Sequence, residues 1–342
     1  MVDIILLNYN GWRDTTDCLE SVFRSDYPEF RVIVCDNGST DESRALLEAW
    51  ARGELRAGER VTSSLQRLVV PPVPKPIEYV VYDRASAAIH ATADAGRRLV
   101  FIHNGGNIGF SAGNNVGVRY ALARGGADYT LFLNNDMLIA PTAVSELVRC
   151  AESDPRIGAT GATILDFREP ELVQEAAGGT FAPWSGMVAM SQRGAARGTT
   201  RSGVPLDYVS GGCLFVRTSV LHEVGLLDER YFIYGEDQDY GIRVRRAGYR
   251  LAYCRVAEVW HRGGGATVHR SAHFDYNSLK SNLQLISKHY PLLLPVAAAY
   301  SVVRCVLPKL ARRQWHRLPA TARAYRDFTA DLLRGRTGAR EA

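Results

Sequence analysis

The first half of the chain alternates short apolar runs with segments whose apolar residues recur at helical spacing. Apolar runs at residues 2–7, 31–35, 99–103 and 129–133 predict buried strands. Between them, helical spacing is seen around residues 19–23 and again over 111–124, where Gly125-Gly126 ends the pattern. This alternation predicts an α/β fold with a mostly parallel sheet covered by helices.

Two local signals predict where helices begin. Ser39 and Glu42 have the spacing of a capping box, which predicts a helix that runs to about Ala51. Pro141 follows the strand at 129–133 and predicts a helix that starts at this proline. We therefore expect a helix directly after each of these two polar turns.

Residues 52–98 interrupt the regular pattern. The prolines in 71–76 favour an extended or loop conformation, because each lacks an N–H donor and restrains the residue before it. We interpret 52–98 as an insertion over the sheet edge, with a strand of its own at residues 79–83. Acceptor binding and surface decoration both stay open as its role.

The second half of the chain is less regular. Residues 210–216 indicate a turn that leads into a strand, and 250–254 predict another short strand. Residues 237–247 have a helical pattern that ends at Gly248, a typical residue at this position after a helix.

Composition is ordinary for a soluble globular protein: 46% of the 342 residues are hydrophobic and 23% are charged. The chain starts with a strand-like segment instead of a secretory signal. Its six cysteines are scattered without a Cys-x-x-Cys pair, which argues against a zinc site or a disulfide framework. We therefore expect a cytoplasmic protein.

Positive charge is concentrated at the carboxyl end. Residues 301–342 contain ten Lys or Arg against three Asp or Glu, whereas the whole chain has a net charge of +5. Pro295 and Arg304 interrupt the apolar segment 292–307, so we interpret it as buried or interfacial and not as a membrane span. Contact with the inner face of a membrane, a solvated helical tail and an oligomer contact through 285–330 are the alternatives.

Asn134-Asn135-Asp136 closes the strand at 129–133 and places one acid and two amides at the carboxyl end of a buried strand. Open α/β sheets bind ligands at this end. One carboxylate can hold one face of a divalent cation whose other ligands are diphosphate oxygens and water. The alternative is an Asn/Asp turn without a ligand.

Two further polar segments precede it. Asp36 follows the second strand as Asn8 follows the first, and its carboxylate can accept the imide N–H of uracil or thymine; helix capping is the alternative. The glycine-rich segment 104–115 lacks the Gly-Lys-Ser/Thr of a P-loop. Its backbone donors can approach a phosphate at a helix N-terminus, or the glycines simply form a tight turn.

Acidic residues and a histidine supply the remaining candidate chemistry. Glu236 and Asp237 start a helix, where acids either interact with the helix dipole or remove a proton from an attacking hydroxyl. His261 follows a tryptophan and precedes three glycines, which would let the chain wrap a diphosphate. An imidazole is a good ligand for ions such as Mn²⁺, although a lone histidine is commonly structural.

Together these segments resemble glycosyltransferase family 2, and within it the rhamnosyltransferase-like branch. The resemblance covers roughly residues 1–290 apart from the insertion. Its motifs occur in the order Asn8-Tyr9-Asn10, Asp36 to Asp41, Asn107 to Asn115, Leu133 to Asp136, Gly211 to Val216, Tyr234 to Asp239 and Trp260-His261.

The resemblance implies a GT-A fold over residues 1–285 and a basic helical extension over 286–342. It also implies an inverting transfer of a sugar from a dTDP- or UDP-sugar, with dTDP-rhamnose as one candidate donor, and a divalent metal, Mn²⁺ or Mg²⁺. The implied donor-binding residues are Asn8, Asn10, Asp36, Asn37, Asn107, Gly109, Asn114, Asn134 and Asn135. Asp136 and His261 would bind the metal, and Asp237, in preference to Glu236, would be the catalytic base. The first two positions of the family's acidic motif are amides here, which weakens the charge at the metal site.

Two other functions fit parts of the pattern. A nucleotidyltransferase also binds a nucleotide and a metal, but the chain lacks a basic glycine-rich loop near its start. A sugar-nucleotide-binding scaffold would bind without turnover. The basic tail alone does not indicate nucleic-acid binding, because stacking aromatics are absent from the rest of the pattern. A glycan, a lipid-linked intermediate and a small molecule all remain candidate acceptors.

Overall fold

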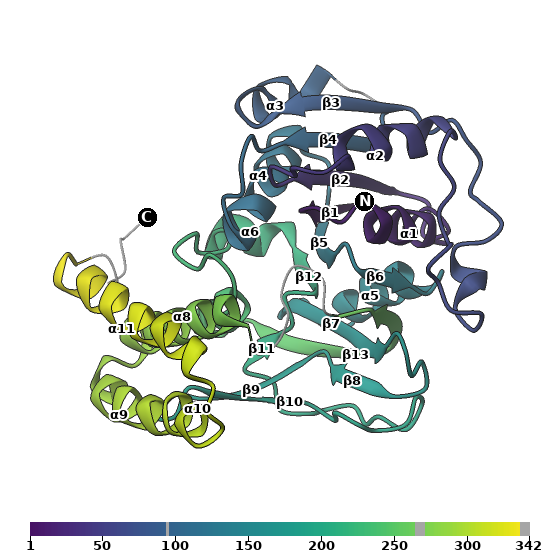
Figure 1. The fold of residues 1–342 in the computed structure, drawn as a ribbon. Helices are drawn as coiled ribbons and strands as arrows, with labels where there is room; N and C mark the ends of the chain where they lie inside the picture. Colours follow the sequence, from purple (N-terminus) through teal and green to yellow (C-terminus); the bar gives the residue numbers. More distant parts are fainter. Residues whose placement is uncertain (94–95, 264–270, 336–342) are drawn as a thin grey trace.

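The computed structural model describes residues 1–93, 96–263 and 271–335 (Figure 1). Within these residues, the larger sheet has the strand order β3-β4-β2-β1-β5-β12-β7-β13-β6, with β8 paired to β7. Its strands are β1 (Val2–Asn8), β2 (Phe30–Asp36), β3 (Tyr79–Asp83), β4 (Leu99–His103), β5 (Tyr129–Asn134), β6 (Met137–Ile139), β7 (Ile157–Asp166), β8 (Val173–Ala176), β12 (Cys213–Arg217) and β13 (Arg250–His261). A smaller antiparallel sheet contains β9 (Gly178–Ala182), β10 (Met187–Met190) and β11 (Tyr208–Val209).

The first five strands of this order, β3 to β5, are all parallel, as the sequence predicts. Beyond β5 the sheet is mixed, because β12 runs antiparallel to both β5 and β7. The strand predicted at residues 79–83 is confirmed: β3 pairs with β4 and extends the edge of the sheet.

Helices α1 to α7 cover both faces of the sheet. The described helices are α1 (Trp12–Val22), α2 (Ser43–Arg52), α3 (Arg84–His90), α4 (Phe110–Arg124), α5 (Ala143–Glu152), α6 (Thr218–Val224), α7 (Glu236–Arg246), α8 (Ala272–His289), α9 (Leu294–Cys305), α10 (Leu307–Ala311) and α11 (Leu318–Leu333). Alternate residues of each strand point to opposite faces. In β1, Ile4 and Leu6 pack with α1, α2 and α5, whereas Ile5 packs with α3, α4, α6 and α7.

One local prediction was wrong, and two were inexact in their bounds. Ser39 does not cap α2, which begins at Ser43 without a side-chain cap; its hydroxyl instead donates to Asp36 Oδ1 at 2.5 Å. The helix predicted to start at Pro141 begins at Ala143, two residues later, and the unpredicted strand β6 lies between Asp136 and this proline. The strand predicted at 250–254 is confirmed and is longer than expected, because β13 continues to His261.

The carboxyl-terminal helices pack together beside the smaller sheet (Figure 1), and α8 packs on α7 through Leu285, Ile286 and Ile242. α8 runs without a break through the predicted domain boundary at residue 285, and α11 packs along it through Leu279, Leu283 and Phe328. Helix therefore dominates the described part of the predicted extension. All six cysteines are free.

Candidate active site

The ends of β1, β2 and β5 meet where the strand order reverses. β1 lies between β2 and β5, and its last residue, Asn8, is in register with Asp36, while Leu7 is in register with Asn134. Ligands of open α/β sheets bind at such a switch point. The structure therefore brings Asn8, Asp36 and Asn134 together, as predicted.

A chain of hydrogen bonds connects these strand ends. Asn135 Nδ2 donates to Thr15 Oγ1 at 2.8 Å, and that hydroxyl donates to Asn8 Oδ1 at 2.8 Å. Asn8 Nδ2 in turn donates to Asp36 Oδ1 at 2.9 Å. Because each side chain fixes the next, this side of the site is held in one arrangement before any ligand arrives.

Asn10 and Ser39 hold the loop that follows Asp36. The Asn10 backbone N–H donates to Ser39 Oγ at 2.9 Å, and Asn10 Oδ1 accepts the Thr40 N–H at 2.8 Å. Asp36 Oδ2 accepts only a long bond from the Ser39 N–H, at 3.2 Å. This oxygen therefore retains acceptor capacity for a ligand.

The glycine-rich loop is fastened by Asn37. Its Nδ2 donates to Asn107 Oδ1 at 3.0 Å and to the Gly109 carbonyl at 3.2 Å. Gly109 has a φ of +93°, and a Cβ there would lie 2.8 Å from the Phe232 backbone oxygen. A glycine is required here by both conformation and space, so the observed contacts support a close turn at the start of α4.

Asn114 lies one turn inside α4 and is buried. Its Nδ2 donates to the Phe110 carbonyl of the same helix at 2.9 Å. A Cβ at neighbouring Gly113 would lie 2.6 Å from Leu7, so α4 packs closely on β1 here. The structure thus gives Asn114 a contact within α4, and its contact with a donor stays a prediction.

Asp136 and His261 face each other. Asp136 follows β5, His261 ends β13, and His261 Nε2 lies 3.4 Å from Asp136 Oδ1. The other ring nitrogen, Nδ1, lies 2.8 Å from Gln174 Oε1 on β8. Burial is the largest single influence and opposes the charged carboxylate, but His261, a backbone hydrogen bond and Arg262 together lower the pKa of Asp136.

These two side chains fit a partly open metal site. Among the described residues, no group of three His, Cys, Asp or Glu side chains could hold a metal, so Asp136 and His261 are candidate ligands as a pair. Gln174 binds Nδ1 and directs Nε2 toward Asp136, as outer partners of metal-binding histidines do. The Arg262 N–H also donates to the Asp136 carbonyl at 3.0 Å, which fixes the backbone. The remaining ligands would come from the donor and water.

Asp237 and Glu236 form the first turn of α7. Asp237 is half-buried; its Oδ2 accepts the Gly211 N–H at 3.2 Å and its Oδ1 the Gln238 N–H at 2.9 Å. Burial raises the pKa of Asp237 to about 6. Burial, with the charge of Asp237, raises the pKa of Glu236 well above its ordinary value, and Glu236 Oε2 has no hydrogen-bond partner. At neutral pH Asp237 is therefore the ionised member of the pair.

Gly211 and Gly212 bring the two halves of the site together. Asn134 N–H donates to the Gly212 carbonyl at 2.8 Å, while Gly211 N–H binds Asp237. A Cβ at Gly212 would lie 2.7 Å from Met137, and one at Gly211 would lie 3.5 Å from Asp237 Cβ. Gly212 thus allows this turn to lie directly against the segment that carries Asp136, whereas a Cβ at Gly211 would make only ordinary contact with Asp237.

Sequence analysis missed Gln174 and its neighbour Glu175 on β8. Burial and the charge of Asp237 raise the pKa of Glu175 to about 7, and Tyr208 donates to its Oε1 at 3.1 Å. β8 itself was not predicted, since its four residues carry no alternating pattern of useful length. Their roles depend on pairing with β7, which the sequence does not reveal.

His103 was also missed, although it ends a correctly predicted strand. It is in register with Asp36, and its Nδ1 lies 4.0 Å from Asp36 Oδ2. Neither ring nitrogen has a hydrogen-bond partner, and the side chain is 10% exposed. Burial lowers the pKa of His103, so the ring is neutral at pH 7 and has one donor and one acceptor.

Asp239 fastens α7 to α8. Its buried carboxylate binds Arg243 Nε at 2.7 Å, Lys288 Nζ at 2.6 Å and His289 Nε2 at 2.7 Å. Burial opposes this charge, yet the three basic partners lower the pKa of Asp239. Asp239 is therefore a structural anion and not a second base.

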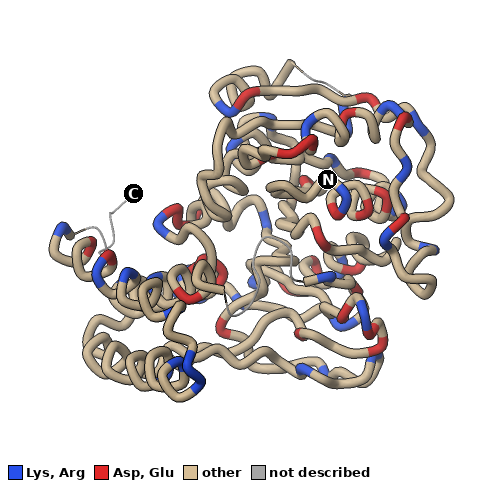
Figure 2. Tube along the Cα trace, viewed as in Figure 1, with Lys and Arg blue, Asp and Glu red and all other residues tan. Residues whose placement is uncertain are grey.

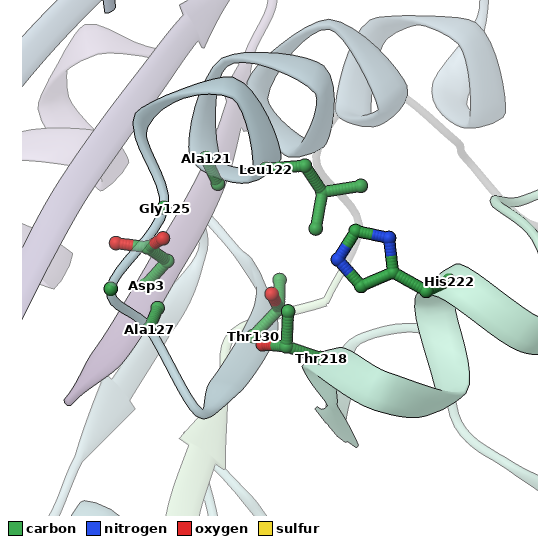
Figure 3. A pocket seen from close by; sticks show the side chains of 9 residues that line it. Asp3, Ala121, Leu122, Gly125, Ala127, Thr130, Thr218 and His222 are labelled. Atoms are coloured by element: carbon green, nitrogen blue, oxygen red, sulfur yellow. The ribbon is translucent and has the colours of Figure 1, made fainter. Parts of the chain in front are cut away.

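A pocket of about 170 Å³ opens at the opposite end of the sheet (Figure 3). Asp3 and Thr130, near the starts of β1 and β5, line it with His222 of α6. Asp3 is engaged in an ion pair with Arg31 at 2.8 Å. Since none of the predicted site residues lines this pocket, it is separate from the site at the carboxyl ends of the strands.

Comparisons with known proteins agree with this geometry. The glycosyltransferase-like family 2 description matches residues 56–274, and the glycosyl transferase family 2 description matches residues 3–62. A low-salt glycan biosynthesis hexosyltransferase, Agl10 of Haloferax volcanii, is 29% identical over 191 residues, 54% of this chain and 58% of that protein. An N-acetylglucosaminyl-diphospho-decaprenol L-rhamnosyltransferase of Mycobacterium tuberculosis is 32% identical over 152 residues, 41% of this chain and 48% of that protein. The matches thus span about half the length of these relatives.

A solved structure with the same fold is that of GalNAc-T7 with UDP, GalNAc and Mn²⁺. It has a TM-score of 0.58 at 14% identity and covers 89% of this chain and 50% of that chain. At this identity the likeness establishes the fold, which confirms the predicted GT-A architecture. With most of its length matched by the family description, the chain belongs to glycosyltransferase family 2.

Proposed function

We propose that this protein transfers a hexosyl or deoxyhexosyl residue from a pyrimidine nucleotide-diphosphate donor to an acceptor hydroxyl, with inversion at the anomeric carbon. The observation that carries the proposal is the pairing of two different centres across Gly211-Gly212. The first centre is the candidate metal site, where His261 Nε2 lies 3.4 Å from Asp136 Oδ1. The second is the candidate base Asp237, whose pKa is raised to about 6.

The donor base would bind between Asp36 and His103. The free capacity of Asp36 Oδ2 suits the imide N–H of uracil or thymine, and a neutral His103 can donate to a neighbouring carbonyl oxygen. Cytosine has no N–H at that ring position. This arrangement therefore favours UDP- and dTDP-sugars over CDP-sugars.

Each protein group has a distinct part in the reaction. A divalent metal, Mn²⁺ or Mg²⁺, would be held by Asp136 and His261 and would neutralise charge on the leaving diphosphate. Asp237 would take the proton of the acceptor hydroxyl as that oxygen attacks. Inversion by a single displacement requires no protein nucleophile. The Mn²⁺ in the GalNAc-T7 structure supports a metal at this fold's donor site.

Rhamnose from dTDP-rhamnose is the finer proposal for the sugar, and a lipid-linked sugar diphosphate or a glycan is the proposal for the acceptor. The M. tuberculosis relative, whose name specifies a decaprenol-linked acceptor and L-rhamnose, supports both. A lipid-linked acceptor would place the protein at the cytoplasmic face of a membrane.

Thermal unfolding with a panel of UDP-, dTDP-, CDP- and GDP-sugars, each with and without Mn²⁺, tests the donor class. Ligands that bind only the folded state raise the melting temperature. We expect the UDP-sugars or the dTDP-sugars to raise the melting temperature, and to raise it more with Mn²⁺ than without. His261→Ala should lose this metal-dependent increase. A CDP-sugar preference, or no shift with any donor, would contradict the proposal.

A further inference from the structure

The carboxyl-terminal helices leave a large apolar surface uncovered. The segment Pro291–Ala311, which contains α9 and α10, is long and apolar enough to cross a membrane, but only 11% of it is buried. Leu292 is 92% exposed, and Val296 and Val303 are each more than half exposed. Soluble proteins rarely expose such a contiguous apolar surface without a partner.

This segment lies along the protein instead of projecting from it. Ala297 of α9 is buried against α8, and Ser301 Oγ lies 2.6 Å from the hydroxyl of Tyr325 on α11. Pro308 lies at the start of α10, and α9 ends at Cys305, so the segment forms two short helices. The inner face of α9 is thus attached to the domain, while the outer face is free for a flat partner.

The turn of the β9–β10 hairpin extends the same surface. Trp184 packs on Tyr300 of α9 with ring centroids 5.2 Å apart, and Tyr300 OH lies 3.7 Å from Met187 Sδ. Trp184 and Met187 are each about half exposed, and both contact α9 through Tyr300. Two segments more than 100 residues apart in the sequence therefore form one surface.

The segment that contains α9 and α10 carries charge of one sign. No Asp or Glu occurs between Asp275 and Asp327, whereas nine Lys or Arg do. Lys309 and Arg317 are buried against Asp275, but Arg312, Arg313 and Trp315 are exposed. Lys and Arg positions are blue along the tube in Figure 2. An exposed tryptophan next to basic residues is typical of the membrane–water interface.

The combination of apolar and basic groups distinguishes between partners. A symmetric contact with a second copy would bring the same basic residues toward each other. A soluble polyanion would leave the apolar face in water. An anionic bilayer interacts with both the apolar face and the basic residues, because acyl chains cover the valines and head groups neutralise the arginines.

We propose that the outer faces of α9 and α10, with Trp184, Met187 and Trp315, dock on the surface of an anionic lipid bilayer. This docking surface is formed independently of the donor site, and it extends the proposed function by placing the enzyme where a lipid-linked acceptor would lie. Arg312 and Arg313 bind head groups, and Leu292, Val296 and Val303 enter the interface without spanning it.

Co-sedimentation with vesicles, without nucleotide or acceptor, tests the docking surface separately from catalysis. We expect the full-length protein to bind phosphatidylcholine vesicles weakly and those with added phosphatidylglycerol at least about tenfold more tightly, with the difference reduced by salt. Arg312→Glu/Arg313→Glu should remove the preference for phosphatidylglycerol. Val296→Glu/Val303→Glu should reduce binding to both kinds of vesicle.

Ile89→Glu, on α3, provides a matched control, because Ile89 is 75% exposed outside this surface. Melting temperatures and donor-induced shifts that match the wild type would show that each variant is folded. Equal binding by Val296→Glu/Val303→Glu and the wild type would overturn the proposal. A dimer in solution that this double variant dissociates would assign the surface to a second copy and would also overturn it.

Discussion

The two sides of the active site are built differently. On the donor side, amides and hydroxyls are joined in a continuous chain from Asn135 through Thr15 and Asn8 to Asp36. On the other side, Glu175, Glu236 and Asp237 are acids whose pKa values are raised by burial. Satisfied polar groups hold a binding surface rigid, whereas under-satisfied acids retain protons near neutral pH. The first arrangement suits recognition and the second suits proton transfer.

The largest effect on the donor side is expected from Gln174→Leu. This change removes the acceptor that orients His261, and loss of such an outer partner typically costs about 10- to 100-fold in metal affinity. Titration of Mn²⁺ in the presence of donor would measure it. Gln174→Glu retains an acceptor and should recover most of the affinity; equal losses in both variants would show that Gln174 acts only through packing.

The acidic side is tested by the pH dependence of stability. The pKa of Glu175 is raised from 4.5 to about 7, so the folded protein takes up a proton that the unfolded chain releases between these values. The contribution of Glu175 to the free energy of unfolding is fully present below pH 4.5 and is lost as the pH rises through 7. Glu175→Gln should therefore raise the free energy of unfolding at pH 8 by ~1–3 kcal/mol relative to the wild type, with little difference at pH 4.5.

Chemical unfolding of both proteins at the two pH values measures this difference. Gln retains an acceptor for the Tyr208 hydroxyl, so the contact at 3.1 Å is not itself removed. A Glu175→Gln variant that is less stable at pH 8 would show that the carboxylate is stabilised by its surroundings and would remove the contrast between the two sides.

A smaller effect is expected from His103→Ala. If His103 donates one hydrogen bond to the pyrimidine, its loss should weaken UDP or dTDP binding by about 0.5–1.5 kcal/mol, or roughly 2- to 12-fold. Calorimetric titration would measure the affinity. The exposed His316→Ala is the control, and unchanged affinity in His103→Ala would separate His103 from base recognition.

The sequence predicted the parallel half of the fold well, because its strands are continuous apolar runs and each motif follows a strand end. It predicted less of the mixed half. β6 has three residues and β8 four, and both depend on partners distant in the sequence. The predicted site residues at strand ends do lie together. Gln174 and Glu175 were not predicted, because the strand that carries them, β8, was not predicted.

Some predictions failed because one residue type serves two purposes. Ser39 has capping-box spacing, yet its hydroxyl binds Asp36 because the loop after β2 folds back on Asn10.

Two glycines after His261, Gly264 and Gly265, lie outside the described residues, so their predicted contact with a diphosphate stays a prediction. The uncovered face of α9 required the structure, since sequence alone left buried and interfacial positions open.

The most direct test of the account is Asp237→Asn, assayed for transfer and for donor binding in the same preparation. Asparagine fits the same space but cannot accept a proton at neutral pH, so transfer should fall by about 10²- to 10⁴-fold while donor affinity with metal stays within about threefold. Asp26→Asn, at an exposed position before β2, is the matched control. Near-normal transfer by Asp237→Asn would contradict the assignment of Asp237 as the base, and with it the division of the site into a binding side and a proton-transfer side.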